Sequence, residues 1–132
     1  MMETMRIRPP VPFLDREANE DCELQGVKIP AGSVISASYL GAHHDPRYWK
    51  DPFEFRPERF DPSNKDQEPA RHAFSYLPFS AGSRNCVGQK FAMLDATLIL
   101  MHIVHNFDVT SDPNEKVFMH YEGTMTPHGF HV

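Results

Sequence analysis

The spacing of proline over residues 43–73 limits the folds open to this chain more than any other feature. The prolines of this segment are Pro46, Pro52, Pro57, Pro62 and Pro69. Each removes a backbone N–H donor and fixes φ, so neither a long helix nor a central strand can run through the segment. Aromatic residues lie between the prolines, whereas disordered linkers are poor in aromatics. These residues are Tyr48, Trp49, Phe53, Phe55 and Phe60. We therefore expect an ordered, irregular segment that packs through its rings.

Short runs of alternating apolar and polar residues precede this segment and predict a small antiparallel sheet. The runs are PFLDREA at 12–18, ELQGVKI at 23–29 and SVISASYL at 33–40. Gly26 and the triplet 30–32 (PAG) supply turns between them. Ahead of the runs, residues 2–8 are good helix formers that prolines stop at once. This short stretch predicts the end of a longer helix, because two turns are marginal alone.

Residues 88–107 carry the strongest helical pattern of the chain. Apolar residues recur there at helical spacing, and further apolar residues fill the gaps between them. Such a broad apolar face predicts a long helix that is mostly buried. Residues 116–132 then predict a C-terminal hairpin that turns near Gly123 or Pro127. The pattern as a whole indicates an α+β fold, mainly α, within one domain or a piece of one.

Composition excludes several classes of function. The net charge of −5 over 132 residues gives no basic field, so we expect no nucleic-acid partner. The longest apolar run, at 98–101, is far shorter than the ~20 residues that cross a bilayer, and we expect no membrane anchor in this chain. Cys22 and Cys86 form no C-x-x-C pair, which argues against a zinc ribbon. The sequence leaves a disulfide between them open.

Cys86 lies in a glycine-bent loop, FSAGSRNCVG, directly before the long helix. A nearby cation, here Arg84, and a helix N-terminus both favour the thiolate form of a cysteine. Gly82 and Gly88 allow the backbone to turn sharply and to approach a flat ligand. These features suit an exposed, metal-ligating thiolate. Two other interpretations stay open at this point, namely a cysteine that packs as a small hydrophobe and a nucleophile that works with one of the eight histidines.

The same loop contains the pattern F-x-x-G-x-R-x-C-x-G. Its five fixed positions are Phe79, Gly82, Arg84, Cys86 and Gly88. This pattern resembles the haem-binding signature of the cytochrome P450 superfamily of haem-thiolate monooxygenases. In that family a cysteine thiolate ligates the iron of haem b and favours O–O cleavage. The resemblance implies that Cys86 is the ligand, that Phe79 shields the sulfur from water and that Arg84 pairs with a haem propionate.

Two further motifs of the family occur in the expected order. Glu3 and Arg6 match E-x-x-R, whose members share one face of a helix. Arg59 lies in PERF, which resembles the family's P-E-R-F element. The resemblance implies that these three residues form one buried ion network, which would hold the irregular segment against the core. On surface helices such pairs contribute little, so this interpretation depends on burial.

The resemblance also implies a function for the protein to which this sequence belongs. It implies a monooxygenase that receives electrons from an NADPH-dependent or ferredoxin-type reductase and oxidises a small apolar substrate such as a sterol or fatty acid. The sequence of the matching segments is closer to eukaryotic microsomal members of the family than to bacterial ones, which implies that a full-length protein is located at the endoplasmic reticulum membrane. The family's domain is several times longer than 132 residues, so we expect residues 1–132 to be its C-terminal haem-binding portion, inactive by itself. Two alternatives stay open, a haem-binding remnant without turnover and an isomerase or dehydratase of the same fold.

The remaining candidate residues favour structural roles. His102 and His105 lie three apart on the long helix, but no carboxylate or cysteine joins them at ligand spacing. Cys22 lies in an expected strand, where we expect it to pack. His43 and His44 precede Asp-Pro, which indicates a turn. Lys90 and Arg71 are expected to be solvated surface charges. The alternative is that they form a basic patch that faces an electron donor.

Overall fold

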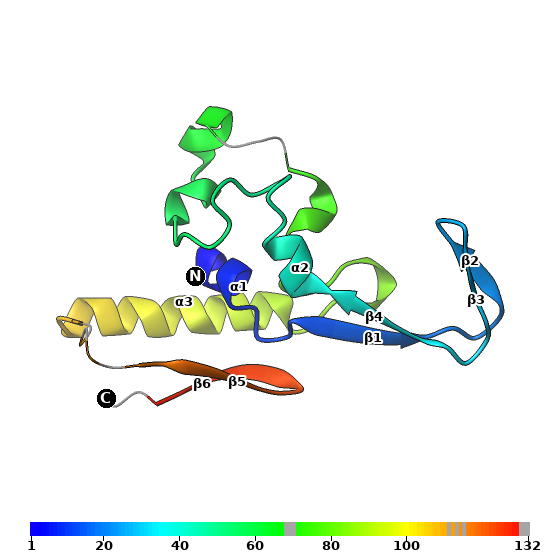
Figure 1. Ribbon diagram of the computed structural model, residues 1–132. Helices are drawn as coiled ribbons and strands as arrows, with labels where there is room; N and C mark the ends of the chain where they lie inside the picture. Colours follow the sequence, from blue (N-terminus) through cyan, green and yellow to red (C-terminus); the bar gives the residue numbers. More distant parts are fainter. Residues whose placement is uncertain (68–70, 111, 113, 115, 130–132) are drawn as a thin grey trace.

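The computed structural model describes residues 1–67, 71–110, 112, 114 and 116–129. The chain begins with α1 (Met2–Ile7), which ends before Pro9 as expected. Strands β1 (Phe13–Glu17) and β4 (Val34–Ser38) form one antiparallel ribbon, and β2 (Cys22–Leu24) and β3 (Val27–Ile29) form a second at its far end (Figure 1). The expected antiparallel pairing is confirmed, as two separate two-stranded sheets.

The expected turn at Gly26 is confirmed and divides the run at 23–29 into β2 and β3. Gln25 and Gly26 both have positive φ there (50° and 82°). Positive φ at both central residues is typical of tight hairpin turns. The run at 33–40 stops being a strand at Ser38. Its side chain accepts a hydrogen bond from the Gly41 N–H (3.0 Å) and caps the short helix α2 (Tyr39–His43).

The proline-rich segment is irregular, as expected, over the residues that the structure describes. It contains only the 3-10 turns η1 (Pro57–Phe60) and η2 (Pro62–Gln67), and each starts at a proline. Residues 68–70 lie outside the described residues. Trp49 is fully buried and packs with Phe60 (ring centroids 5.8 Å apart) and with Tyr76 (6.1 Å). Phe53 and Phe55 are exposed, so only part of the ring packing is confirmed.

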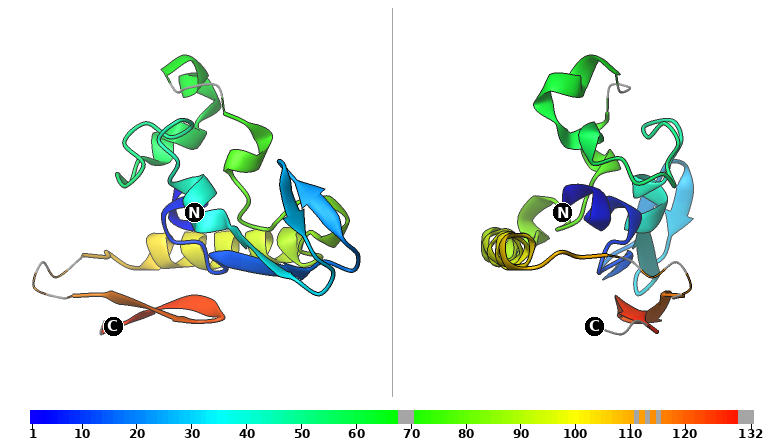
Figure 2. Two further views of the ribbon diagram at one scale, coloured as in Figure 1. Left: turned by 45° about the vertical axis from the view of Figure 1, so that its right-hand side comes forward. Right: turned by 90° about the vertical axis from the view of Figure 1, so that its left-hand side faces the viewer.

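A third 3-10 turn, η3 (Ala73–Ser75), leads to the cysteine loop, which contains η4 (Gly82–Arg84). Helix α3 (Gln89–Asn106) follows with the expected bounds. The expectation that this helix is mostly buried is wrong, because none of its residues is buried and Phe91 and Val104 are both 75% exposed. A helix that is apolar all round needs neighbours on every side. Figure 2 shows α3 at one edge of the molecule, in end view on the right.

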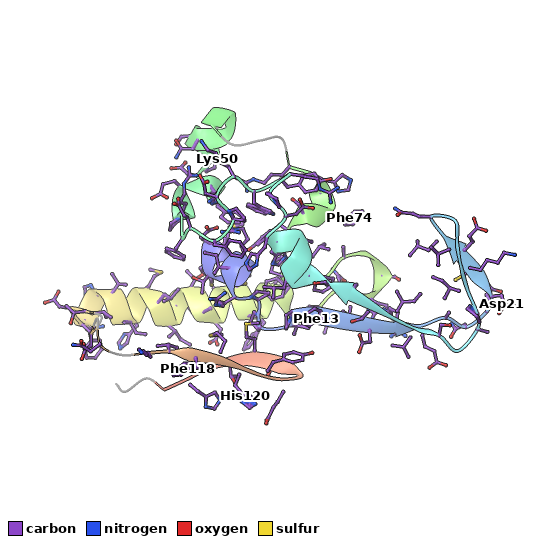
Figure 3. All side chains as sticks on the ribbon, viewed as in Figure 1. Phe13, Asp21, Lys50, Phe74, Phe118 and His120 are labelled. Atoms are coloured by element: carbon purple, nitrogen blue, oxygen red, sulfur yellow. The ribbon has the colours of Figure 1, made fainter. Side chains whose placement is uncertain are left out.

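The C-terminal hairpin forms from β5 (Phe118–Glu122) and β6 (Thr124–His128) and turns at Gly123 (φ 76°), which confirms the first of the two expected turn positions. Its last residues, 130–132, lie outside the described residues. The hairpin is tied to the rest of the chain by a hydrogen bond from the Met125 N–H to the Pro10 carbonyl (2.7 Å). Phe13, which is labelled in Figure 3, also meets Tyr121 edge to face, with ring centroids 5.9 Å apart.

Candidate functional site

The cysteine loop closes on itself through its backbone. The Cys86 N–H donates to the Phe79 carbonyl (2.9 Å), and the Asn85 N–H donates to the Gly82 carbonyl (3.2 Å). Gly82 has φ +79°, a conformation that glycine adopts at little cost. Ser80 also has positive φ (63°), which is uncommon for a residue with a side chain. The loop is therefore a specific conformation that its own hydrogen bonds hold.

The Cys86 thiol is exposed and lies three residues before α3. This exposure contradicts the interpretation of Cys86 as a buried hydrophobe. No histidine hydrogen-bonds to Cys86 in the part of the chain that the structure describes, so nothing there supports a histidine-activated nucleophile. Gly88 caps the helix with ordinary φ (−83°), and a Cβ at Gly88 would lie 3.8 Å from the Cys86 Sγ. This distance is ordinary contact, so the chain itself leaves room for a side chain there.

A largely apolar cavity of about 550 Å³ opens beside the thiol. The cysteine loop, one edge of α3, and the segments around α1 and β1 form its walls. The lining residues named by the sequence analysis are Phe79, Arg84 and Cys86. The others are Met1, Met5, Pro10, Val11, Leu14, Tyr39, Pro78, Ser80, Ala92, Met93 and Ala96. Its volume is typical of small-molecule sites. The cavity thus offers apolar walls, one sulfur and one guanidinium.

Glu3, Arg6 and Arg59 meet in a second, buried cluster on the other side of α1. Arg6 binds both carboxylate oxygens of Glu3, Nε to Oε2 and Nη2 to Oε1, at 2.8 Å each. The Arg59 Nε lies 3.3 Å from Oε1. All three residues are at most 4% exposed. Burial alone would raise the pKa of Glu3, but hydrogen bonds from Arg6 and the Arg56 backbone, with the charges of Arg6 and Arg59, outweigh it and lower the pKa.

The guanidinium groups of this cluster also hold the irregular segment. Arg6 Nη1 donates to the carbonyls of His43 (2.9 Å) and Pro52 (2.7 Å), and its Nη2 donates to the carbonyl of Glu54 (3.2 Å). Arg59 donates to the Asp51 carbonyl (2.7 Å). The network therefore satisfies backbone carbonyls of a segment that has no ladder of its own. It fixes the segment's position against α1.

Two residues beside this network, Arg71 and His43, were misread by the sequence analysis. Trp49 lies under two cations, with Arg6 5.0 Å and Arg71 4.5 Å from its ring centroid. Arg71 therefore covers an aromatic ring, and its assignment as a solvated surface charge is wrong. His43 is fully buried and its ring contacts Tyr76 (centroids 5.3 Å apart), so a turn role does not describe it. Nothing local in the sequence HHDP signals this burial.

The other candidates lie apart from both clusters. Cys22 is exposed, so the expectation that it packs is wrong, and both cysteines are free thiols. His102 hydrogen-bonds within α3 to Asn106, and no group of three potential metal ligands occurs among the described residues. Lys90 is exposed, as expected. In the described ranges, no helix combines the length and the hydropathy that a membrane span requires.

Comparison with known proteins identifies the family. The model of the cytochrome P450 family matches residues 1–131. Cytochrome P450 4V2 of Mus musculus is 47% identical over 114 residues, which are 86% of this chain and 21% of the relative. Probable cytochrome P450 4p3 of Drosophila melanogaster is 41% identical, over 98% of this chain and 25% of the relative. Thromboxane-A synthase of Macaca fascicularis is 40% identical, over 91% and 22%. The chain spans about a fifth to a quarter of these relatives.

Solved structures agree in fold. The haem domain of cytochrome P450DA superposes with a TM-score of 0.84 at 26% identity, over 98% of this chain and 28% of that one. A cyanobacterial CYP120A1 with bound retinoic acid superposes with a TM-score of 0.83 at 32% identity, over 96% and 28%. The members of the matched family and these two structural neighbours are haem-binding proteins. The chain therefore belongs to the cytochrome P450 family and has the fold of a C-terminal portion of its haem domain.

Proposed function

We propose that this chain supplies the cysteine-bearing side of the haem site of a haem-thiolate monooxygenase, with Cys86 as the iron ligand. The observation that carries the proposal is an exposed thiol in the wall of a largely apolar cavity. That cavity fits haem b chemically, because haem is a flat apolar ring with anionic edge groups and its iron accepts a sulfur ligand. When bound, haem supplies the oxygen-activating chemistry of the site, and a thiolate ligand favours it.

The side chains around Cys86 have separate roles in this proposal. Arg84 lines the same cavity and pairs with a haem propionate, since a planar guanidinium matches a carboxylate. Phe79 lines it as well and keeps water from the sulfur. Gly82 allows the left-handed turn that brings Arg84 and Cys86 to one cavity, and Gly88 gives close approach at the start of α3. Glu3, Arg6 and Arg59 have a structural role, because they hold the irregular segment and do not line this cavity.

The extent of the match supports a proposal about the whole protein. We propose that residues 1–132 are the C-terminal haem-binding portion of one domain, because the family model matches residues 1–131 and the chain spans about a fifth to a quarter of its relatives. The remainder would then supply the opposite face of the cavity and the contacts to a small apolar substrate such as a sterol or fatty acid. Electrons would come from an NADPH-dependent or ferredoxin-type reductase, at the endoplasmic reticulum membrane.

One relative supports a second candidate function. Thromboxane-A synthase, at 40% identity, carries the name of a synthase and not that of a monooxygenase. An isomerase or dehydratase of the same fold would need no external electrons. Substrate-dependent NADPH consumption with a reductase present separates the two, since only a monooxygenase consumes it.

The ligand assignment is tested with the two exposed cysteines as a matched pair. The haem-loaded full-length protein is reduced and exposed to CO, and the Soret band is recorded for the wild type, Cys86→Ser and Cys22→Ser. We expect the red-shifted, thiolate-type band in the wild type and in Cys22→Ser, and its loss in Cys86→Ser. A thiolate-type band that survives in Cys86→Ser would contradict the assignment.

A further inference from the structure

Helix α2 (Tyr39–His43) joins the ion network to the cysteine loop. On one side, Arg6 Nη1 donates to the His43 carbonyl (2.9 Å). On the other side, the Leu77 N–H donates to the His43 Nε2 (2.7 Å), and the Tyr39 hydroxyl donates to the Ser80 Oγ (2.7 Å). Both ends of this one-turn helix therefore bond to the segment just ahead of Cys86. Figure 1 shows α2 above the start of α3, between the irregular segment and the loop.

The His43 contact requires a neutral imidazole. Because Nε2 accepts a hydrogen bond, the ring proton is on Nδ1, and Nδ1 has no close hydrogen-bond partner among the described residues. Burial, together with the charges of His44 and Arg6, lowers the pKa of His43 to about 4, against backbone carbonyls of α1 that raise it. The ring is thus uncharged near neutral pH, and its lone pair is available to Leu77.

The Tyr39 contact acts where the loop backbone is strained. Ser80 has φ +63°, a conformation that costs energy in a residue with a side chain and persists only where its surroundings hold it. The Ser80 N–H also donates to the Leu77 carbonyl (3.2 Å), which closes a tight turn over residues 77–80. Phe79, inside this turn, accepts the hydrogen bond of the Cys86 N–H (2.9 Å). The two residues that α2 holds therefore flank the residue that holds Cys86.

We propose that α2 is a clamp, formed by His43 and Tyr39, that positions Cys86 for ligation by fixing the turn at residues 77–80. The proposal rests on the proposed function of Cys86. His43 and Tyr39 are positioning residues in it: His43 acts on the sulfur through the Leu77 backbone, and Tyr39, which also lines the cavity, acts through the Ser80 hydroxyl. The property that matters at position 43 is a hydrogen-bond acceptor at the place of Nε2. A polar side chain at position 43 that places no acceptor there would not hold Leu77.

Two amide variants separate acceptor position from polarity. A glutamine at position 43 places its oxygen near the position of Nε2, whereas an asparagine is one methylene too short to reach Leu77. The ferrous–CO spectrum of the haem-loaded protein gives the ratio of thiol-type to thiolate-type bands. We expect His43→Asn to raise this ratio about tenfold, as the loss of one buried hydrogen bond would, and His43→Gln to stay within about twofold of the wild type. His44→Gln, on the same helix end without a contact to the loop, is the control and should match the wild type.

Tryptophan fluorescence shows whether a variant is folded, because Trp49 is the single tryptophan and is fully buried beside the clamp. With native Trp49 emission, a His43→Asn ratio equal to that of the wild type would overturn the proposal, and so would equal ratios in the Asn and Gln variants. If His43→Asn loses native emission, Tyr39→Phe decides, since it removes one hydroxyl only. A raised ratio in Tyr39→Phe supports the clamp, and an unchanged ratio overturns it. A wild type without a thiolate-type band would instead refute the proposed function itself.

Discussion

Replacement of Glu3 by alanine should be the most damaging single change in the ion network. The Glu3 carboxylate contacts both Arg6 and Arg59, and the side chains of both arginines are 0% exposed. The carboxylate accepts from Arg6 at 2.8 Å through each oxygen, from Arg59 at 3.3 Å and from the Arg56 N–H at 2.9 Å. Glu3→Ala removes all of these bonds and leaves two buried cations close together.

The size of the effect follows from this geometry. Removing one partner of a buried ion pair costs about 3–5 kcal/mol, because the remaining charge has lost its compensation in a medium of low dielectric. A chain of this length has a folding free energy of about 7–20 kcal/mol. With a urea m value of about 2 kcal/mol per molar, Glu3→Ala should lower the unfolding midpoint by about 1.5–2.5 M.

The assay is urea unfolding followed by the fluorescence of buried Trp49. Asp45→Ala is the control, since it breaks an ion pair of similar length (2.6 Å to Arg47) whose arginine is 79% exposed, and such pairs contribute little. Arg59→Ala and the double variant complete a cycle in which we expect a coupling of about 0.5–3 kcal/mol. A Glu3→Ala shift no larger than that of Asp45→Ala would refute the reasoning.

Three further predictions follow from buried or strained groups. The free energy of unfolding should fall as the pH drops from about 6.5 to 4, because the unfolded chain takes up a proton at His43 in this window and the folded chain does not. In urea titrations at several pH values, His43→Gln should reduce this dependence on pH. Part of it should remain, because the pKa of His44 is also lowered and acts in the same direction. Gly129→Ala should destabilise the C-terminal hairpin more than Gly26→Ala destabilises the turn between β2 and β3, as measured by hydrogen exchange. Both glycines have φ near +80°, but a Cβ at Gly129 would lie 2.9 Å from the Lys116 carbonyl oxygen, whereas a Cβ at Gly26 would meet open space. The 132 residues expressed alone should self-associate in sedimentation and show no substrate-dependent NADPH use, because α3 exposes apolar side chains along its length; a monomer with coupled turnover would contradict this.

The elements that local patterns determine were predictable from the sequence. Residues 2–7 stop at a proline pair, residues 89–106 repeat at helical spacing, and Gly123 turns the last hairpin. The motif around Cys86 predicted a glycine-bent loop before the long helix, because the residue types that form it lie within ten positions. The resemblance of PERF and E-x-x-R to family motifs implied that Arg59 would meet Glu3 and Arg6.

The features that were not predictable depend on contacts between distant segments. Periodicity shows that α3 is apolar, but it cannot show which elements cover it. The run at 33–40 reads as a strand because its alternation continues past Ser38, whereas capping of Gly41 by that serine starts a helix. The buried position of His43 depends on Leu77, 34 residues away, and no local pattern reports such a bond.

The distribution of buried groups explains why this part of the fold depends on polar contacts. The fully or nearly fully buried residues of the described chain include Glu3, Arg6, His43 and Arg59, whereas the large apolar residues of α3 lie at the surface. Apolar burial is non-directional and tolerates small shifts, but an arginine that binds a carboxylate through two nitrogens fixes distance and angle together. A cysteine that must present its sulfur to a rigid planar cofactor needs that kind of precision. Arg6 and Leu77 both hydrogen-bond to His43, one at its carbonyl and the other at its ring, so a single residue links the position of the cysteine loop to that of the ion network.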